Sequence, residues 1–225
     1  MASHPEKIEM LEPDSCALLL VDYQAQMLFG VKSRDRDVVI NNVVALTRTA
    51  ETFNVPIIVS TLASNTLNGP LFMDLQAVLP PEVQTIDRTA LNPWESAAFQ
   101  SAVKKVKRGK LLIGALWSHV SLTYTTLGAL AEGYQAYPVI DASGAPTVEA
   151  HEMAVQRMLI SGAIPVSWQQ LMFEFQRDWA NTRTAERVHE ITRHYFGAFS
   201  QGIVHPQLLT GEKGRTGMRP GERSH

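Results

Sequence analysis

Residues 17–22 read ALLLVD, a continuous apolar run that ends in an acidic residue. A strand buried on both faces of a parallel sheet has this pattern, because helices cover both of its sides. Further short apolar runs follow along the chain, separated by amphipathic stretches with helical spacing. This regular alternation predicts right-handed βαβ units, and therefore a three-layer α/β/α protein with a parallel sheet in the middle.

The same reading gives six strands, expected at residues 17–22, 56–61, 84–88, 110–115, 136–141 and 164–167. Helices are expected at residues 37–53, 71–79, 95–107, 120–132, 148–160, 168–180 and 184–195. An eightfold barrel needs about 250 residues, so an open doubly wound sheet suits this chain of 225 residues better. We expect one domain over residues 1–200, followed by a tail or subunit-contact arm over residues 201–225.

The composition excludes several classes of protein. Twenty basic residues against 22 acidic ones give a net charge of −2, which offers no electrostatic basis for binding nucleic acid or an anionic membrane. A single cysteine, Cys16, excludes an intrachain disulfide framework and any site of several thiolates, and fits a reducing compartment. No apolar run is long enough to span a membrane, and the first fifteen residues are too charged for a signal peptide. We therefore expect a cytoplasmic protein.

In an open parallel sheet, ligands bind outside the carboxyl ends of the strands, where the strand order reverses. Asp22 lies at such an end, where a partly desolvated carboxylate can act as a general acid or base, or else cap the following turn. Ser121 falls near the first turn of the helix after the fourth strand, either as a reactive hydroxyl or as an ordinary helix-start serine. His119 is two residues from Ser121, a poor spacing for a dyad on one helix.

Other kinds of site find little support in the sequence. His151, His189 and His194 lie in polar helical stretches and are expected at the surface, so we expect no metal site. The segment VDYQAQMLFG after the first strand lacks the glycines of a phosphate-binding loop, which argues against a dinucleotide cofactor. No serine-hydrolase elbow of the form Gly-x-Ser-x-Gly surrounds Ser121.

Several segments together resemble the isochorismatase-like hydrolase superfamily, and within it the YcaC-like branch. They are LLLVDYQAQMLFGV, RTALNPWESAAF, KLLIGALWSHVSLTY, ALAEGYQAYPVIDASG and VEAHEMAVQRMLISGAIPVSWQQLMFEFQRDW, and they cover roughly residues 15 to 180 in order. The resemblance implies a six-stranded parallel sheet in the order 3-2-1-4-5-6. In that order strands one and four are neighbours, so Asp22 and Ser121 would face each other at the switch point.

Typical members of this superfamily hydrolyse C–N bonds with an aspartate, a lysine and a nucleophilic cysteine. By resemblance, Asp22 matches the aspartate and Arg88 is the nearest candidate for the positive charge. Many relatives carry a Thr-Glu-Val-Cys run where this chain reads SHVS over residues 118–121, so Ser121 stands in the place of the cysteine. A serine hydroxyl needs a better base than a thiol does, and a carboxylate is a weaker base than histidine. Cys16 cannot act as the nucleophile instead, because six residues of strand place Cys16 about 20 Å from Asp22.

Three functions follow from this pattern. The first is hydrolysis of an amide-type C–N bond of a small molecule with Ser121 as the nucleophile, weakened or silenced by the loss of the thiol. The second is hydrolysis of a vinyl ether with Asp22 as a general acid and no nucleophile, as in true isochorismatases. The third is an inactive protein that keeps the pocket for a small ligand.

The pocket and the assembly can also be predicted. Substrate-binding residues are expected among those near the strand ends, and the aromatic ones suit a planar or apolar substrate unless they belong to the core: Tyr23, Gln24, Phe29, Trp94, Trp117, Ser118 and His119. The C-terminal region carries more aromatic residues than one sheet edge needs, which favours a homo-oligomer: Trp168, Phe173, Phe175, Trp179, Tyr195, Phe196 and Phe199.

Overall fold

The computed structural model describes residues 10–200, and their centre is a parallel sheet of five strands. The strands are β1 (Cys16–Val21), β2 (Ile57–Leu62), β3 (Thr85–Arg88), β4 (Lys110–Ala115) and β5 (Gln135–Pro138). Their order in the sheet is β3-β2-β1-β4-β5, so β1 pairs with both β2 and β4. The predicted three-layer α/β class is therefore confirmed, with the first five strands in the expected order.

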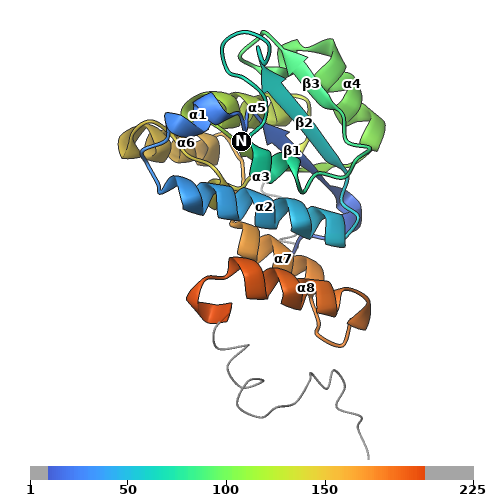
Figure 1. Cartoon of the computed structure of the whole chain (residues 1–225). Helices are drawn as coiled ribbons and strands as arrows, with labels where there is room; N and C mark the ends of the chain where they lie inside the picture. Colours follow the sequence, from blue (N-terminus) through green and yellow to red (C-terminus); the bar gives the residue numbers. More distant parts are fainter. Residues whose placement is uncertain (1–9, 201–225) are drawn as a thin grey trace, which may run out of the picture.

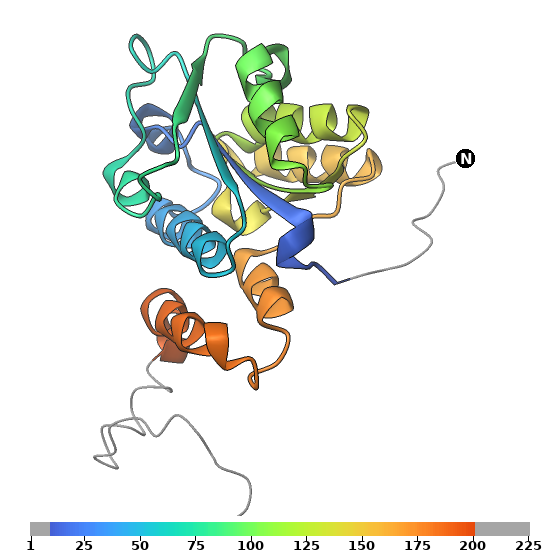
Figure 2. The same ribbon diagram turned by 90° about the vertical axis from the view of Figure 1, so that its right-hand side faces the viewer.

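Strand β1 divides the hydrophobic core in two, because its side chains alternate between the faces of the sheet. Leu18 and Leu20 pack into the cluster formed with α2 (Arg36–Thr52), α3 (Met73–Gln76), α7 (Trp168–Gln176) and α8 (Thr182–Tyr195). Ala17, Leu19 and Val21 pack into the cluster under α4 (Ala97–Val106), α5 (Thr123–Ala131) and α6 (Val148–Ile160). Figures 1 and 2 show these helical layers on opposite faces of the sheet, with α7 and α8 lying beyond α2.

The sixth strand predicted at residues 164–167 is not formed. Val166 makes an isolated parallel bridge with Val139, and its amide donates to the carbonyl of Pro138 at 3.0 Å. The amide of Ile164 also donates to the carbonyl of Ala136, at 2.9 Å, but Pro138 has no N–H to donate back to Ile164, so no second bridge forms. The predicted fifth strand also ends early, at Pro138, because residues Ile140–Ala142 form the 3-10 turn η4.

Three predicted helices differ clearly in their bounds, and one of them, expected at residues 168–180, ends at Gln176 as α7. The one expected at residues 71–79 is reduced to the single turn α3. The one expected at residues 120–132 begins earlier, as a π-helical turn η3 (Ser118–Leu122) that runs directly into α5. The short helices α1 (Ala25–Phe29), η1 (Pro13–Ser15) and η2 (Pro93–Glu95) were not expected. Ser121 consequently lies within the wide turn η3 rather than at the start of a regular helix.

The predicted tail, residues 201–225, lies outside the described residues. Within residues 10–200, no helix is both long enough and apolar enough to cross a membrane.

Candidate active site

The strand register brings together three side chains that the sequence singled out. Asp22 follows Val21, the last residue of β1, which pairs with Ser60 of β2 and Ala115 of β4. Arg88 ends β3, two strands away and therefore about 10 Å from β1. A side chain as long as that of arginine spans this distance, whereas Ser121 lies just after the neighbouring strand β4.

These side chains form one hydrogen-bonded group. The Nη2 atom of Arg88 donates to Oδ1 of Asp22 at 2.8 Å and to Oδ2 at 2.7 Å. The hydroxyl of Ser121 donates to the same Oδ2 at 2.6 Å. Nη1 of Arg88 donates to the carbonyl of Ala90. Asp22 and Ser121 have no exposed surface, and Arg88 is buried, so the ion pair lies in a low-dielectric environment.

The backbone of Asp22 adopts a left-handed conformation, with φ at 58°. Its amide donates to the carbonyl of Ser60, and its own carbonyl accepts from the amide of Gln24 at 2.8 Å. This conformation is unfavourable for a residue with a Cβ atom, although aspartate adopts it more readily than most. Backbone strain of this kind is concentrated at functional sites, where surrounding contacts hold it in place.

Burial raises the pKa of Asp22 above its ordinary value of 3.8, while Arg88 and the hydrogen bond from Ser121 act in the opposite direction. Asp22 can therefore exchange a proton at a higher pH than an exposed carboxyl would. In its ionised form it is placed to accept the hydroxyl proton of Ser121, and in its neutral form it can act as an acid. The arrangement supports proton transfer between Asp22 and an atom beside Ser121.

Gln24, expected to bind substrate, instead holds the loop after β2. Its Nε2 donates to the carbonyls of Leu62 and Gly69, at 3.1 and 2.6 Å, and its Oε1 accepts from the amide of Leu62 at 2.8 Å. Both amide protons are used, so this side chain has no donor left for a ligand. These bonds give Gln24 a structural role, and its contact with a ligand stays a prediction.

Tyr23 and Trp94 belong to the core. Tyr23 is fully buried and its hydroxyl donates to the carbonyl of Ala142 at 2.8 Å. Trp94 packs edge-on against Phe99, and its indole N–H donates to the carbonyl of Thr125 at 2.7 Å. Both polar groups are satisfied within the protein, as buried tyrosine and tryptophan require.

Trp117, His119 and Phe29 remain at least partly exposed. Trp117 donates its indole N–H to the carbonyl of Met27 at 2.7 Å and stacks on His119 with the ring planes 12° apart. Nδ1 of His119 is buried without a hydrogen-bond partner, and burial lowers the pKa of this imidazole. Phe29 is largely exposed. Trp117 and His119 thus form an aromatic surface beside η3 with an unused polar atom.

His151 was expected at the surface, and this prediction is wrong. It is only 9% exposed, and its Nδ1 atom lies 2.7 Å from the hydroxyl of the buried Ser118. The spacing of His151, Ala154 and Met158, three and four residues apart, places all three on the buried face of α6. That spacing was the signal in the sequence that could have identified it. His189, by contrast, stacks on the half-exposed Trp179, and His194 is exposed.

Within residues 10–200, no three side chains of histidine, cysteine, aspartate or glutamate gather in a way that could hold a metal ion. The thiol of Cys16 is buried at the opposite end of β1, and burial raises its pKa. The chemistry available at the carboxyl end of the sheet is that of Asp22, Arg88 and Ser121.

Comparison with known proteins identifies the family. The family model of the isochorismatase domain matches residues 16–170, which include all three side chains of the group. This chain belongs to the isochorismatase family. The parallel sheet with helices on both faces is the isochorismatase-like α/β fold.

The most informative relatives are YcaC proteins. Probable hydrolase YcaC of Escherichia coli strain K12 is 33% identical over 171 residues, covering 76% of this chain and 82% of that protein. The structure of YcaC from Pseudomonas aeruginosa, with hexane-2,5-diol and covalent acrylamide, has a TM-score of 0.85 at 32% identity, covering 89% and 98% of the two chains. The Escherichia coli YcaC structure, an octameric hydrolase of unknown specificity, has a TM-score of 0.86 at 30% identity, covering 91% and 100%. The chain thus belongs to the isochorismatase-like hydrolase family and is related to the YcaC proteins.

Proposed function

We propose that this protein hydrolyses an amide-type C–N bond of a small molecule, with Ser121 as the nucleophile and Asp22 as the base. The observation that carries the proposal is the buried hydrogen bond of 2.6 Å from the Ser121 hydroxyl to Asp22. A nucleophile within hydrogen-bond reach of a base that is itself held by a third group is the usual arrangement for covalent catalysis. Arg88 is that third group, since it binds both oxygens of Asp22.

The reaction follows from these contacts. Oγ of Ser121 attacks the carbonyl carbon while its proton passes to Asp22, and the carbonyl oxygen becomes an oxyanion. When this intermediate collapses, the C–N bond breaks and Asp22 returns the proton to the leaving nitrogen. Water then attacks the ester on Ser121, again through Asp22, and releases a carboxylic acid. Arg88 keeps Asp22 oriented and cannot itself take a proton, because its pKa exceeds about 12.

Acrylamide, a small amide, is covalently attached in the YcaC structure from Pseudomonas aeruginosa, and small amides are therefore the first probes to test. Because Asp22 and Ser121 have no exposed surface, we expect the partly exposed Trp117 and His119 to move when a substrate binds. A stacked aromatic pair at this position favours a planar or apolar acyl group.

The test is turnover of a panel of primary amides and ureido acids by the natural chain, Ser121→Ala and Ser121→Cys. We expect Ser121→Ala to lose turnover and Ser121→Cys to gain it by about tenfold or more, because a thiol is more readily ionised than a hydroxyl. Intact-mass measurement after rapid quenching should show an acyl group on the natural chain, absent from Ser121→Ala. Turnover that survives in Ser121→Ala contradicts the nucleophilic role.

The raised pKa of Asp22 favours one alternative, in which Asp22 is a general acid that protonates a vinyl ether. The two mechanisms require opposite protonation states. Amide hydrolysis needs ionised Asp22, so kcat/KM should rise as pH increases through its raised pKa; vinyl-ether hydrolysis should fall over the same interval. Ligand binding without turnover in either assay would identify the inactive, ligand-binding form.

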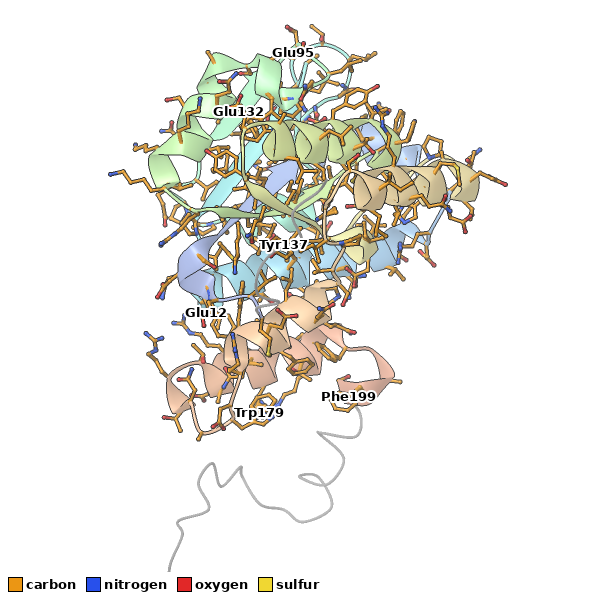
Figure 3. All side chains as sticks on the ribbon, turned by 180° about the vertical axis from the view of Figure 1, so that it is seen from behind. Glu12, Glu95, Glu132, Tyr137, Trp179 and Phe199 are labelled. Carbon is orange, nitrogen blue, oxygen red and sulfur yellow. The ribbon has the colours of Figure 1, made fainter. Side chains whose placement is uncertain are left out.

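The relationship to an octameric YcaC supports a homo-oligomer as well. Phe173, Trp179 and Phe199 are 40%, 50% and 61% exposed. Figure 3 places Trp179 and Phe199 in the C-terminal region, remote from the sheet. Burying these rings against another copy would remove apolar surface from water. Light scattering of the purified chain measures the oligomer directly, and a monomer would contradict the expectation. A cytoplasmic location, and the absence of nucleic-acid or membrane partners, stay predictions.

A further inference from the structure

A second polar pair lies next to the candidate nucleophile and has no part in the reaction proposed above. The Ser118 hydroxyl and Nδ1 of His151 are 2.7 Å apart, and they join the turn η3 to helix α6 across 33 residues of sequence. Ser118 has no exposed surface, and His151 is more than nine-tenths buried. A buried polar pair of this kind is costly to leave unsatisfied, so each partner depends on the other.

Ser118 is also the point at which η3 is tied to the surrounding chain. Its amide donates to the carbonyl of Gly144 at 2.8 Å, and its carbonyl accepts from the hydroxyl of Thr123 at 2.7 Å. Ser121 follows three residues later in the same turn. The position of Ser121 therefore depends on where Ser118 is held, and His151 is the side-chain partner that holds it.

The pair lacks the features of a catalytic Ser–His unit. Within residues 10–200, no carboxylate hydrogen-bonds to the ring of His151, whereas a serine-hydrolase triad uses one to orient its histidine. Burial lowers the pKa of His151, with Arg34 acting in the same direction, so the imidazole is neutral near pH 7. A neutral ring with its proton on Nε2 can accept a hydrogen bond at Nδ1 from the Ser118 hydroxyl, which suits a structural tether.

We propose that His151 is a positioning residue which, through Ser118, holds the turn η3 so that the side chain at position 121 remains against Asp22. The proposal rests on the function proposed above, because holding the side chain at position 121 against Asp22 affects turnover only if these two groups carry the reaction. It predicts that loss of the tether impairs the chemical step more than substrate binding. It also predicts that a side chain able to replace Nδ1 restores the activity.

The test uses Ser121→Cys as a reporter that needs no turnover. The rate of alkylation of position 121 by iodoacetamide is measured against pH, and peptide mass spectrometry separates this thiol from Cys16. Contact with Asp22 and Arg88 should displace the pKa of the new thiol from the free value of about 8.5. Adding His151→Leu or Ser118→Ala should return it toward 8.5, and combining both should add little to either. Adding His151→Asn, which keeps a polar atom near the Nδ1 position, should preserve the displaced value.

Turnover gives the second readout, in the same set of variants. We expect His151→Leu and Ser118→Ala each to lower kcat by about tenfold while KM changes by less than about twofold, since misplacing a reacting group acts on the chemical step. His151→Asn should recover most of kcat. Ser118→Ala keeps the test valid if His151→Leu does not fold.

Two results would overturn the proposal. One is a pKa of the thiol at position 121 that does not change when His151→Leu or Ser118→Ala is added in folded protein, or that already equals the free value of about 8.5 in Ser121→Cys alone. The other is an acyl group found on Ser118, which would make the pair a nucleophile and its base. If the thiol responds as expected but no amide is hydrolysed, the positioning role holds and the proposed function fails.

Discussion

The two ends of strand β1 carry two side chains that can ionise, a thiol and a carboxyl, and only the carboxyl is surrounded by groups that can take part in a reaction. Cys16 begins the strand and Asp22 directly follows its last residue, and neither has exposed surface. Burial raises the pKa of both. Within residues 10–200, however, the thiol has one hydrogen-bond contact, of 3.7 Å with the hydroxyl of Ser15, whereas the carboxylate is bound by side chains from β3 and η3. A buried group without such neighbours is inert, whereas a buried group contacted by side chains from several strands and helices can exchange protons with them.

Asp22→Asn should produce the largest effect and sharpen this contrast. The amide keeps the shape of the carboxyl but leaves Arg88 as a buried charge without its counter-ion. Breaking a buried ion pair in this way costs about 3–5 kcal/mol of unfolding free energy. Loss of the base should reduce turnover at least about a hundredfold. Urea denaturation and steady-state kinetics measure the two effects.

Cys16→Ala is the matched control at the other end of the strand. It removes a buried side chain without stranding a charge, so we expect a loss of about 1 kcal/mol and unchanged turnover. If Cys16→Ala abolished turnover or Asp22→Asn left it intact, the assignment of chemistry to the carboxyl end would be wrong. A further variant, Asp22→Asn with Arg88→Met, should regain stability but not activity, since it removes the unpaired charge.

Two glycines near the opposite ends of β4, Gly109 just before the strand and Gly114 within it, extend the comparison to backbone packing. A Cβ atom on Gly114 would lie 2.5 Å from the hydroxyl oxygen of Tyr23, which is held by its hydrogen bond to Ala142. A Cβ atom on Gly109 would meet nothing within 4 Å. We therefore expect Gly114→Ala to cost about 1–3 kcal/mol through overpacking. Gly109→Ala should stay within about 0.5 kcal/mol of the natural chain. Equal losses in thermal unfolding would show that the carboxyl end is not the more tightly packed one.

Much of the fold could be predicted because its pattern is local. The run ALLLVD alone indicated a strand covered on both sides, and its alternating residues do divide between the two core clusters. The sixth strand could not be judged in this way, because a strand is defined by its pairing. Residues 164–167 have strand-like side chains, but Pro138 of the neighbouring β5 has no N–H to donate to Ile164, so only a single bridge forms.

The site was predictable to the extent that parallel strands end at one edge. The ends of β1, β3 and β4 were enough to place Asp22, Arg88 and Ser121 near one another, although their roles stay a proposal. Gln24 and His151 could not be assigned from position alone. Gln24 lies at the same edge, yet its side-chain amide donates to the backbone carbonyl of Leu62. His151 is 33 residues away in the sequence from its partner Ser118. Hydrogen-bond partners of buried polar groups depend on tertiary contacts that no local pattern encodes.

The smallest predicted effect concerns the pH dependence of the inert end of β1. Burial raises the pKa of Cys16 above its ordinary value of 9.0, so the folded chain keeps the thiol proton at a pH where the unfolded chain releases it. Stability from this group is therefore complete below pH 9 and is lost as pH rises toward the folded pKa, with a slope of at most about 1.4 kcal/mol per pH unit. Cys16→Ala lacks this loss. Between pH 8 and 10 its unfolding free energy should fall less steeply than that of the natural chain, while tyrosines and lysines titrate equally in both. Parallel curves would mean that the Cys16 thiol ionises as easily in the folded chain as in the unfolded one, which would contradict the effect of its burial.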